Sequence, residues 1–397
     1  MADLAERNHY ISFHCFECIN EEVILSNIRA NGLFVLDSRD FHIKKLEPFI
    51  HVPYGIERIH SCSCAWGQTV YFSPDCNGSG IHKYNAATGE QSRIETGSFT
   101  CGGAFPLDDG IVFLPTYKAD GIWKLDIETD RLSPVRWRGF REGEAPYYIE
   151  SGQASDGKIW MTPVGGPYLF IIDPAAWETR RMVIGDSGCQ LLQCAQEGTF
   201  FWFTRLNDER IIRWNMESGD VRYYTLYQPG SKERFAYRDM WFLYKRIIAC
   251  EGRAFIVDGS GIYSIDAESG DSELLALLPK ENLKAAISNW YVEHCICGRK
   301  AVVCFCPTNL VAVIDLDTLN VTFYDTTVRD APEFEEYVRM VCDQKMEEAL
   351  KNKVTMEGSE PDLNDLEGLI ALVQYCGKEE AAAEKSAGIG EVIYRNV

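Results

Sequence analysis

Val70-Tyr-Phe-Ser-Pro74 and Gly80-Ile-His-Lys-Tyr-Asn85 are two short, largely apolar stretches separated by a few turn-forming residues, and the second ends in Asn. The same arrangement, an apolar strand pattern closed by Asp or Asn, recurs seven times along the chain. The seven copies end at Asp37, Asn85, Asp126, Asp173, Asn215, Asp266 and Asp315. Consecutive copies are 41 to 51 residues apart, the length of one four-stranded blade, so the repeat predicts a seven-bladed β-propeller.

The repeated Asp or Asn is interpreted as a turn former. Its short side chain can accept a hydrogen bond from the backbone two residues further on. The motif continues as Thr88-Gly89, Ser218-Gly219 or Ser269-Gly270 in three of the copies, which is typical of a tight turn. Binding of a metal ion by these oxygens is the alternative, and we favour the turn.

The predicted fold is all-β, with one seven-bladed β-propeller over residues 8–326 and a helical C-terminal extension over residues 327–397. Four strand patterns can be counted within the first blade and four within the last, so both terminal blades look nearly complete in themselves. Helix-start patterns at Asp330 and Ser359 each precede an apolar stripe at helical spacing. The extension ends in a strand-like segment from Ile389 to Val397, which is either a latch strand for the ring or a free tail.

Composition limits the compartment and the partners. The chain has 397 residues and a formal net charge of −20, from 39 basic and 59 acidic side chains. A surface this acidic repels phosphate backbones and anionic lipids, so nucleic acid and membranes are not expected partners. The first ten residues lack the basic start and apolar core of a secretory signal. The 15 cysteines are therefore interpreted as reduced thiols of a cytoplasmic protein.

The repeat unit has a constant internal order: apolar strand, Pro, short loop, Gly-Ile, and then Tyr or Leu before Asp or Asn. Val112-Phe-Leu-Pro115 followed by Gly121-Ile-Trp-Lys-Leu-Asp126 shows it clearly. In this order, over about residues 20–325, the chain resembles a group of cytosolic bacterial seven-bladed β-propeller proteins of largely unassigned function. Some of them lie among genes for surface polysaccharides, which implies a setting but no chemistry.

A second resemblance is carried by Gly198-Thr-Phe-Phe-Trp-Phe-Thr204, which is similar to the repeats of streptogramin lyase propellers. Those lyases need His and Glu side chains around a divalent metal ion. This sequence has no His-x-Glu or Glu-x-His triplet in a corresponding loop, so the resemblance does not carry the activity with it.

Cysteine and histidine crowd the first and last predicted blades, at His14-Cys15-Phe-Glu-Cys18 and at His294-Cys295-Ile-Cys297. Cys304 and Cys306 follow on the next strand, so the four thiols of the last blade come within reach of one another. Zinc needs a tetrahedron of ligands, which a flat Cys-x-Cys hairpin wraps poorly. Buried apolar cysteines are the favoured interpretation, and we predict no metal site and no cofactor.

Three long connections between predicted strands are rich in Arg, Tyr and Trp. Consecutive blades send equivalent loops to the same rim, so these side chains are expected to gather around one mouth of the central channel. Guanidinium groups suit carboxylates or phosphates and aromatic faces suit sugar rings. The expected ligand is therefore an anionic small molecule, a carbohydrate or an acidic protein segment. The alternative is that these side chains only brace the loops. The candidate ligand-binding residues are Arg141, Tyr147, Arg205, Arg234, Tyr237, Arg238 and Trp290.

The sequence leaves two classes of function open. A cytoplasmic ligand- or protein-binding scaffold, linked to carbohydrate or cell-surface biosynthesis, is the leading hypothesis because no nucleophile and base stand out by spacing. The rival is a lyase or hydrolase at the channel mouth that uses a His with Glu or Asp, with or without a divalent ion. His51 and His60 flank the connection into the second blade and are the candidates to face the channel, although a lone His is more often structural. No catalytic residue can be assigned from these patterns.

Overall fold

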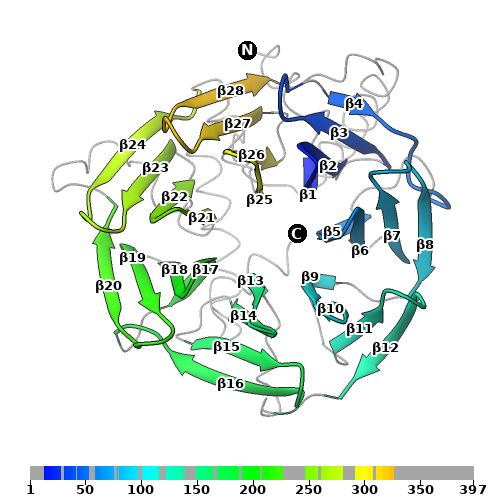
Figure 1. Ribbon diagram of the computed structural model, residues 1–397, viewed down its shortest axis with the longest axis horizontal. Coiled ribbons are helices and arrows are strands. Elements are labelled where there is room, and N and C mark those ends of the chain that lie inside the picture. The colour runs from blue at the N-terminus through cyan, green and yellow to red at the C-terminus, as the bar shows by residue number, and fades with distance from the viewer. Residues whose placement is uncertain are drawn as a thin grey trace, which may run out of the picture. The chain divides into compact units, whose positions relative to one another are not determined.

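Seven four-stranded antiparallel sheets form a ring in the computed structural model, as predicted (Figure 1). The chain divides into two compact units, Met1–Cys342 and Asp343–Val397, and all residues described below belong to the first. The predicted C-terminal helices and the strand-like segment at the end of the chain lie outside the described residues. The structure describes residues 13–27, 31–41, 43–52, 59–75, 78, 80–96, 101–115, 122–136, 138, 149–163, 168–186, 190–205, 208–226, 246–257, 261–279, 291–306 and 310–325.

Each sheet is one blade, built from four consecutive strands with the first nearest the ring axis and the fourth on the outside (Figure 1). Blade 1 contains β1 (Phe13–Ile19), β2 (Glu22–Asn27), β3 (Leu33–Asp37) and β4 (Ile43–Lys45), and blade 2 contains β5 (His60–Trp66), β6 (Thr69–Pro74), β7 (Gly80–Asn85) and β8 (Gln91–Glu95). Blade 3 contains β9 (Cys101–Leu107), β10 (Gly110–Pro115), β11 (Ile122–Asp126) and β12 (Arg131–Val135), and blade 4 contains β13 (Ile149–Ser155), β14 (Lys158–Pro163), β15 (Tyr168–Asp173) and β16 (Glu178–Val183). Blade 5 contains β17 (Leu191–Glu197), β18 (Phe200–Arg205), β19 (Asp208–Asn215) and β20 (Val221–Thr225). Blade 6 contains β21 (Arg246–Cys250), β22 (Arg253–Val257), β23 (Gly261–Asp266) and β24 (Ser272–Leu277). Blade 7 contains β25 (Tyr291–Cys297), β26 (Lys300–Cys306), β27 (Leu310–Asp315) and β28 (Val321–Asp325).

The middle strands of each blade are continuous apolar runs because both faces of the sheet are buried. In β2, Val23, Ile24 and Leu25 are all fully buried. Successive side chains of a strand point to opposite faces. Accordingly, Val23 and Leu25 belong to the apolar cluster between blades 7 and 1, whereas Ile24 belongs to the cluster between blades 1 and 2. A strand with one wet face would instead alternate apolar and polar residues.

The repeated Asp or Asn makes the turn between the third and fourth strands, as predicted. In every one of the seven copies a side-chain oxygen accepts a hydrogen bond from the backbone N–H two residues on, at 2.8 to 3.1 Å. In the first copy the Arg39 side chain also donates to Asp37 and lowers the pKa of that carboxyl to about 2. Local backbone bonding therefore accounts for the repeat.

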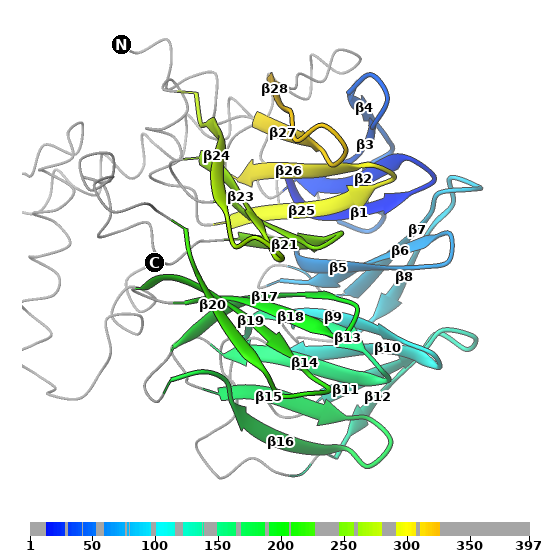
Figure 2. The same cartoon turned by 60° about the vertical axis from the view of Figure 1, so that its left-hand side comes forward.

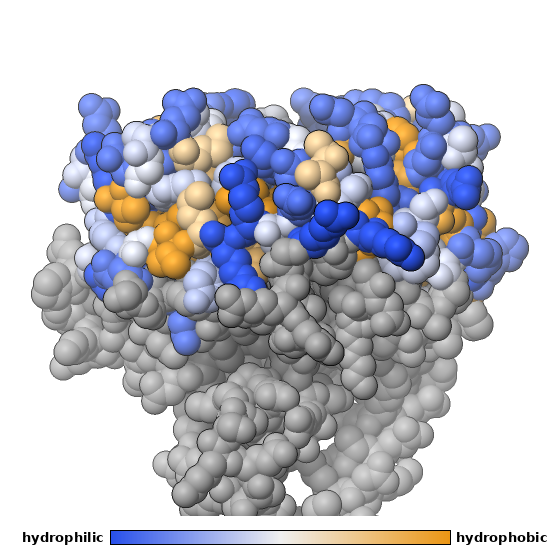
Figure 3. Space-filling model, turned by 90° about the horizontal axis from the view of Figure 1, so that it is seen from below, coloured by the Kyte–Doolittle hydropathy of each residue, from blue (hydrophilic) through white to orange (hydrophobic). Residues whose placement is uncertain are grey.

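The ring has two different faces because consecutive strands of each blade run in opposite directions. The turns that join first to second and third to fourth strands are short and lie on one side, called here the turn face, at the right in Figure 2. The strand ends that flank residues 139–148, 227–245 and 280–290 lie on the other side, called here the loop face. Seen edge-on with the turn face at the top, hydrophilic side chains line the upper edge of the described surface, and hydrophobic patches lie lower on the outer wall (Figure 3).

The ring closes between blades 7 and 1, where strands from the two ends of the propeller lie side by side (Figure 1). Side chains from both blades form one apolar cluster there, including Phe34 and Val302. Lys300 adds a polar contact, because its Nζ donates to the Ser38 carbonyl oxygen at 2.8 Å and lies 5.1 Å from the centre of the Phe41 ring. Closure therefore rests on packing between two complete blades.

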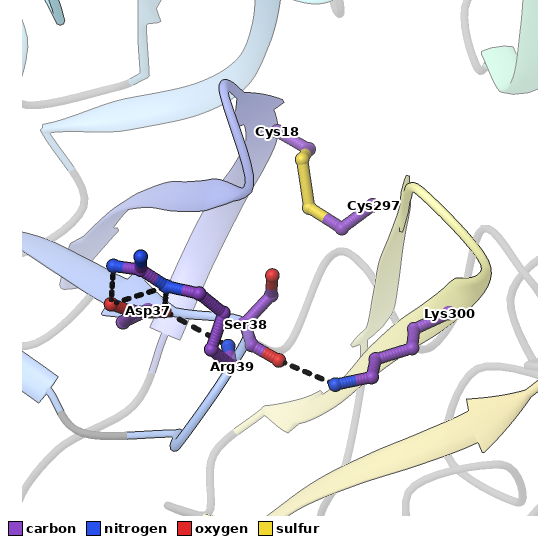
Figure 4. The surroundings of a disulfide bond; sticks show 6 residues. All are labelled: Cys18, Asp37, Ser38, Arg39, Cys297 and Lys300. Carbon is purple, nitrogen blue, oxygen red and sulfur yellow. Dashed lines mark hydrogen bonds and ion pairs between the residues drawn. A yellow bond between two sulfur atoms is a disulfide. The ribbon is translucent and has the colours of Figure 1, made fainter.

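A disulfide bond between Cys18 and Cys297 crosses the same interface (Figure 4). The two Cα atoms are 5.7 Å apart, although the residues are separated by 279 positions in the chain. The expectation of reduced thiols is therefore wrong for this pair, while eight other described cysteines form no disulfide bond. Spacing along the chain could not show the pairing, because only ring closure makes β1 and β25 neighbours.

Replacing Cys18 with Ser is expected to lower the free energy of unfolding by about 2–5 kcal/mol, because a cross-link over so long a loop strongly restricts the unfolded chain. Chemical denaturation without reductant measures the change. Cys250→Ser, which removes a half-buried free thiol on β21, is the matched control and should change stability by less than about 1 kcal/mol. A reductant should abolish the difference between wild type and Cys18→Ser; equal stability of the two without reductant would contradict a stabilising bond.

Candidate functional site

One of the seven candidate ligand-binding residues, Arg205, lies within the described residues. It ends β18 on the loop face and is buried, with 6% of its surface exposed. Arg141, Tyr147, Arg234, Tyr237, Arg238 and Trp290 lie outside the described residues, so their gathering on one rim stays a prediction.

Asp186 organises the described polar groups near Arg205. The Tyr223 hydroxyl donates to one carboxylate oxygen of Asp186 at 2.7 Å, and Arg210 donates to the other at 3.2 Å. The guanidinium of Arg210 also lies 5.1 Å from the centre of the Tyr223 ring. The Tyr223 hydrogen bond, with the charges of Arg210 and Arg205, lowers the pKa of Asp186. For Arg210, bracing of a connection between blades is thus the observed role.

A second set of polar side chains lies on the innermost strands, around the ring axis. They come from blades 5, 6, 7, 1 and 2 in order around the ring, and each interacts with the next. This set, called here the axial polar cluster, consists of Gln193 on β17, Arg246 on β21, Glu293 on β25, Glu17 on β1 and Ser63 on β5.

Arg246 is the hub of the cluster. Its guanidinium donates to the Gln193 side-chain oxygen at 2.9 Å, to the Val292 carbonyl oxygen at 2.6 Å and to the Glu293 carboxylate at 2.7 Å. The side chains of Arg246 and Glu293 are 19% and 25% exposed. A charge-assisted bond in such surroundings is stronger than one on an open surface, because water screens it less. One side chain therefore ties three innermost strands together.

Glu17 continues the cluster into blades 1 and 2. The Ser63 hydroxyl donates to its carboxylate at 2.9 Å. Burial, together with the negative charge of Glu293, raises the pKa of Glu17 to about 7, although the bonds from Ser63 and the Ala65 backbone oppose the shift. A carboxyl group with such a pKa can give or accept a proton near neutral pH, which is what general acid–base chemistry requires.

His294 lies beside Glu293 on β25. Burial and the nearby positive charge of Arg246 lower its pKa to about 3, so the imidazole is neutral at physiological pH. Its Nδ1 atom is buried and has no hydrogen-bond partner within the part of the chain that the structure describes. An imidazole with so low a pKa takes up a proton only in acid, so Glu17 and not His294 is the group of the axis that can exchange a proton near neutral pH.

His60, one of the two histidines expected to face the channel, packs inside the connection between blades 1 and 2. His60 is buried, and its Nε2 lies 2.9 Å from Nδ1 of His82. The His60 ring also packs edge-on against Phe49, with centres 4.4 Å apart. Burial lowers the pKa of His82 to about 4. The pair therefore anchors the connection between blades 1 and 2, which is a structural role.

The thiols of the last blade do not form a described metal site. Cys297 is oxidised, Cys304 is buried in the apolar cluster between blades 7 and 1, and Cys295 packs against it. Within the described ranges, no three His, Cys, Asp or Glu side chains are placed to hold a metal ion. These cysteines act as small apolar groups, apart from the one that is cross-linked.

Comparison with known proteins defines the class of fold. The chain matches no known protein family and no curated protein sequence. Among solved structures, virginiamycin B lyase from Staphylococcus aureus is similar with a TM-score of 0.56 and 13% identity over 75% of this chain and 93% of the lyase. A streptogramin B lyase has the same TM-score and identity over 80% of this chain and 94% of its own. The extracellular domain of a two-component system from B. thetaiotaomicron follows, with a TM-score of 0.54 and 11% identity over 77% of this chain and 39% of that one. At such identities the likeness shows a shared seven-bladed β-propeller and no more.

The axial polar cluster was not found from the sequence. Glu17 occurs within the cysteine-rich pattern of the first blade and Glu293 directly precedes that of the last, so a charged residue inside a largely apolar strand is the available signal. Arg246 opens a strand after a long connection and looks like an ordinary loop-end arginine. Its contacts with blades 5 and 7 depend on the ring geometry.

Replacing Glu17 with Gln is expected to stabilise the protein at pH 8 by about 1–3 kcal/mol and to leave stability near pH 4.5 almost unchanged. The folded pKa of about 7 lies above the unfolded value of 4.5, so the stability that neutral Glu17 contributes is complete below pH 4.5 and is lost as pH rises through 7. Denaturation midpoints of both proteins across this range measure the effect. Glu47→Gln, at an exposed position, should show no such gain; a pH-independent difference for Glu17→Gln would refute the interpretation.

Proposed function

We propose that this protein is a cytoplasmic binding scaffold: a stiff propeller whose loop face recognises a ligand or a protein partner. The observation that carries the proposal is the Arg246 side chain, which links three innermost strands through Gln193, Val292 and Glu293. Arg246, Gln193 and Glu293 are thus occupied in holding blades 5, 6 and 7 together. Recognition is then left to the long connections of the loop face, where function commonly resides on repeat scaffolds.

The proposed ligand is an anionic small molecule, a carbohydrate or an acidic protein segment, in a setting linked to carbohydrate or cell-surface biosynthesis. Several arginines on one rim of a chain with a net charge of −20 would create a local positive basin. Arg210 is already paired with Asp186, so the proposal depends on the arginines of the longer connections, Arg141, Arg234 and Arg238. The same overall charge argues against nucleic acid and membrane surfaces as partners.

Arg238→Ala is expected to weaken binding of an anionic oligosaccharide by about 1–3 kcal/mol while leaving the unfolding midpoint unchanged, because the proposal assigns this side chain to the ligand. Calorimetric titration of the full chain with oligogalacturonate measures this, and neutral malto-oligosaccharide of equal length is the comparison ligand. Arg222→Ala, an exposed arginine on β20, is the matched control and should bind like the wild type. Equal binding of both sugars, or an equal loss in the control, would contradict an anion-binding rim.

Glu17 favours a second candidate, a lyase or hydrolase that works on the axis of the ring. Its pKa of about 7 lets this carboxyl group donate or accept a proton near neutral pH. The fold likeness to streptogramin B lyases makes streptogramin B a sensible first substrate to test.

If the second candidate holds, full-length protein turns over a streptogramin B antibiotic and Glu17→Gln lowers the rate by roughly 100-fold or more, the usual contribution of a general acid or base. Product formation followed by mass spectrometry measures this, with Glu47→Gln as the control carboxyl. The rate should change with an apparent pKa near 7. No turnover would exclude a streptogramin B lyase, and full activity in Glu17→Gln would exclude Glu17 as the general acid or base.

A further inference from the structure

The innermost strands carry a second pair of neighbouring cysteines. Cys62 on β5 and Cys101 at the start of β9 place their Sγ atoms 3.9 Å apart across the interface between blades 2 and 3. Both are free thiols. They lie toward the loop face, because the innermost strands begin there, whereas Cys18 and Cys297 lie beside the short turns of the other face. Neither cysteine belongs to the axial polar cluster or to the candidate ligand-binding residues.

The surroundings hold the two thiols toward each other. The Cys62 sulfur lies 2.7 Å from the Ser73 hydroxyl, and the Cys101 thiol donates to the Gly103 carbonyl oxygen at 3.0 Å. The Ser61 hydroxyl donates to the carbonyl oxygen of Cys101, which joins the two strands. Cys62 is half-buried, whereas Cys101 is fully buried. A small reagent therefore reaches Cys62 first.

We propose that Cys62 and Cys101 are a reversible oxidation site, which a low-molecular-weight disulfide converts into a bond between blades 2 and 3. First, Cys62 loses its proton and attacks the reagent RSSR, giving a mixed disulfide Cys62–S–S–R and one RSH. Cys101 then loses its proton and attacks the Cys62 sulfur, giving the Cys62–Cys101 disulfide and a second RSH. Two thiols are oxidised and one reagent disulfide is reduced to two thiols.

The geometry favours this product over a metal ion held by the two sulfurs. A disulfide needs the sulfur atoms to approach from 3.9 Å to about 2 Å, and the two thiols lie on adjacent innermost strands. A metal site would need further ligands, and within the described residues no three His, Cys, Asp or Glu side chains are placed to hold an ion. The contact with Cys101 and burial raise the pKa of the Cys62 thiol well above its usual value, which disfavours the thiolates that a metal ion needs and makes the attack of Cys62 on the reagent slow. Cys18–Cys297 shows that neighbouring innermost strands of this ring accept a disulfide.

The test is to equilibrate full-length protein with oxidised glutathione, block remaining thiols with iodoacetamide after unfolding, and analyse tryptic peptides by mass spectrometry. The expected product is a link between the peptides 59–83 and 94–118, with the loss of about 2 Da that oxidation of two thiols requires. Dithiothreitol should remove the link.

Three variants assign the link, because peptide 59–83 also contains Cys64 and Cys76. Cys62→Ser and Cys101→Ser should lose the linked peptide completely. Cys64→Ser, the matched control two residues along the same strand, should keep it at the wild-type level. Any of four results overturns the proposal: both thiols alkylated, glutathione remaining on Cys62, a link from Cys62 to Cys15, or a link that survives in Cys62→Ser.

Discussion

The structure depends on the burial of both faces of every blade. A sheet such as blade 1, with Ile24 on one face and Leu25 on the other, has two apolar surfaces and no wet side. A row of such sheets would always leave one apolar face open at each end, and only a closed ring covers all of them. The interface between blades 7 and 1 is therefore the point at which the whole arrangement is completed. Its apolar cluster, Lys300 and the Cys18–Cys297 bond all act there.

Closure also determines the chemistry of the axis. Seven innermost strands converge, so side chains near the axis must be small or must pair with a neighbour. Crowding is evident at Gly103 and Gly152, where an added Cβ atom would come within 2.6 Å of the Phe105 ring. The free thiols of several innermost strands suit the same constraint, because cysteine is a small, largely apolar side chain.

Charged groups are tolerated at the axis because they form hydrogen bonds and ion pairs with neighbouring polar groups. Arg246 satisfies Glu293 and Gln193, so its own burial is compensated by three hydrogen bonds. Glu17 is buried, accepts hydrogen bonds from the neutral Ser63 hydroxyl and the Ala65 backbone, and feels the negative charge of Glu293, so its pKa is raised to about 7. The same network thus gives the ring stiffness and leaves one proton-active group. A stiff ring suits a binding platform, and a carboxyl group with a pKa near 7 suits acid–base catalysis.

The sequence by itself determined the number of blades, their strand order and the turn role of the repeated Asp or Asn, because these depend on contacts within one repeat. For the same reason, the strands of blades 1 and 7 could be predicted from the sequence with nearly the bounds that the structure shows. The partners across blade interfaces were decided only by the tertiary structure. Cys18 meets Cys297, and Arg246 meets Gln193 and Glu293, because the ring brings together innermost strands that the chain separates by whole blades. Local periodicity specifies each sheet, whereas the packing of sheets around an axis specifies which side chains meet.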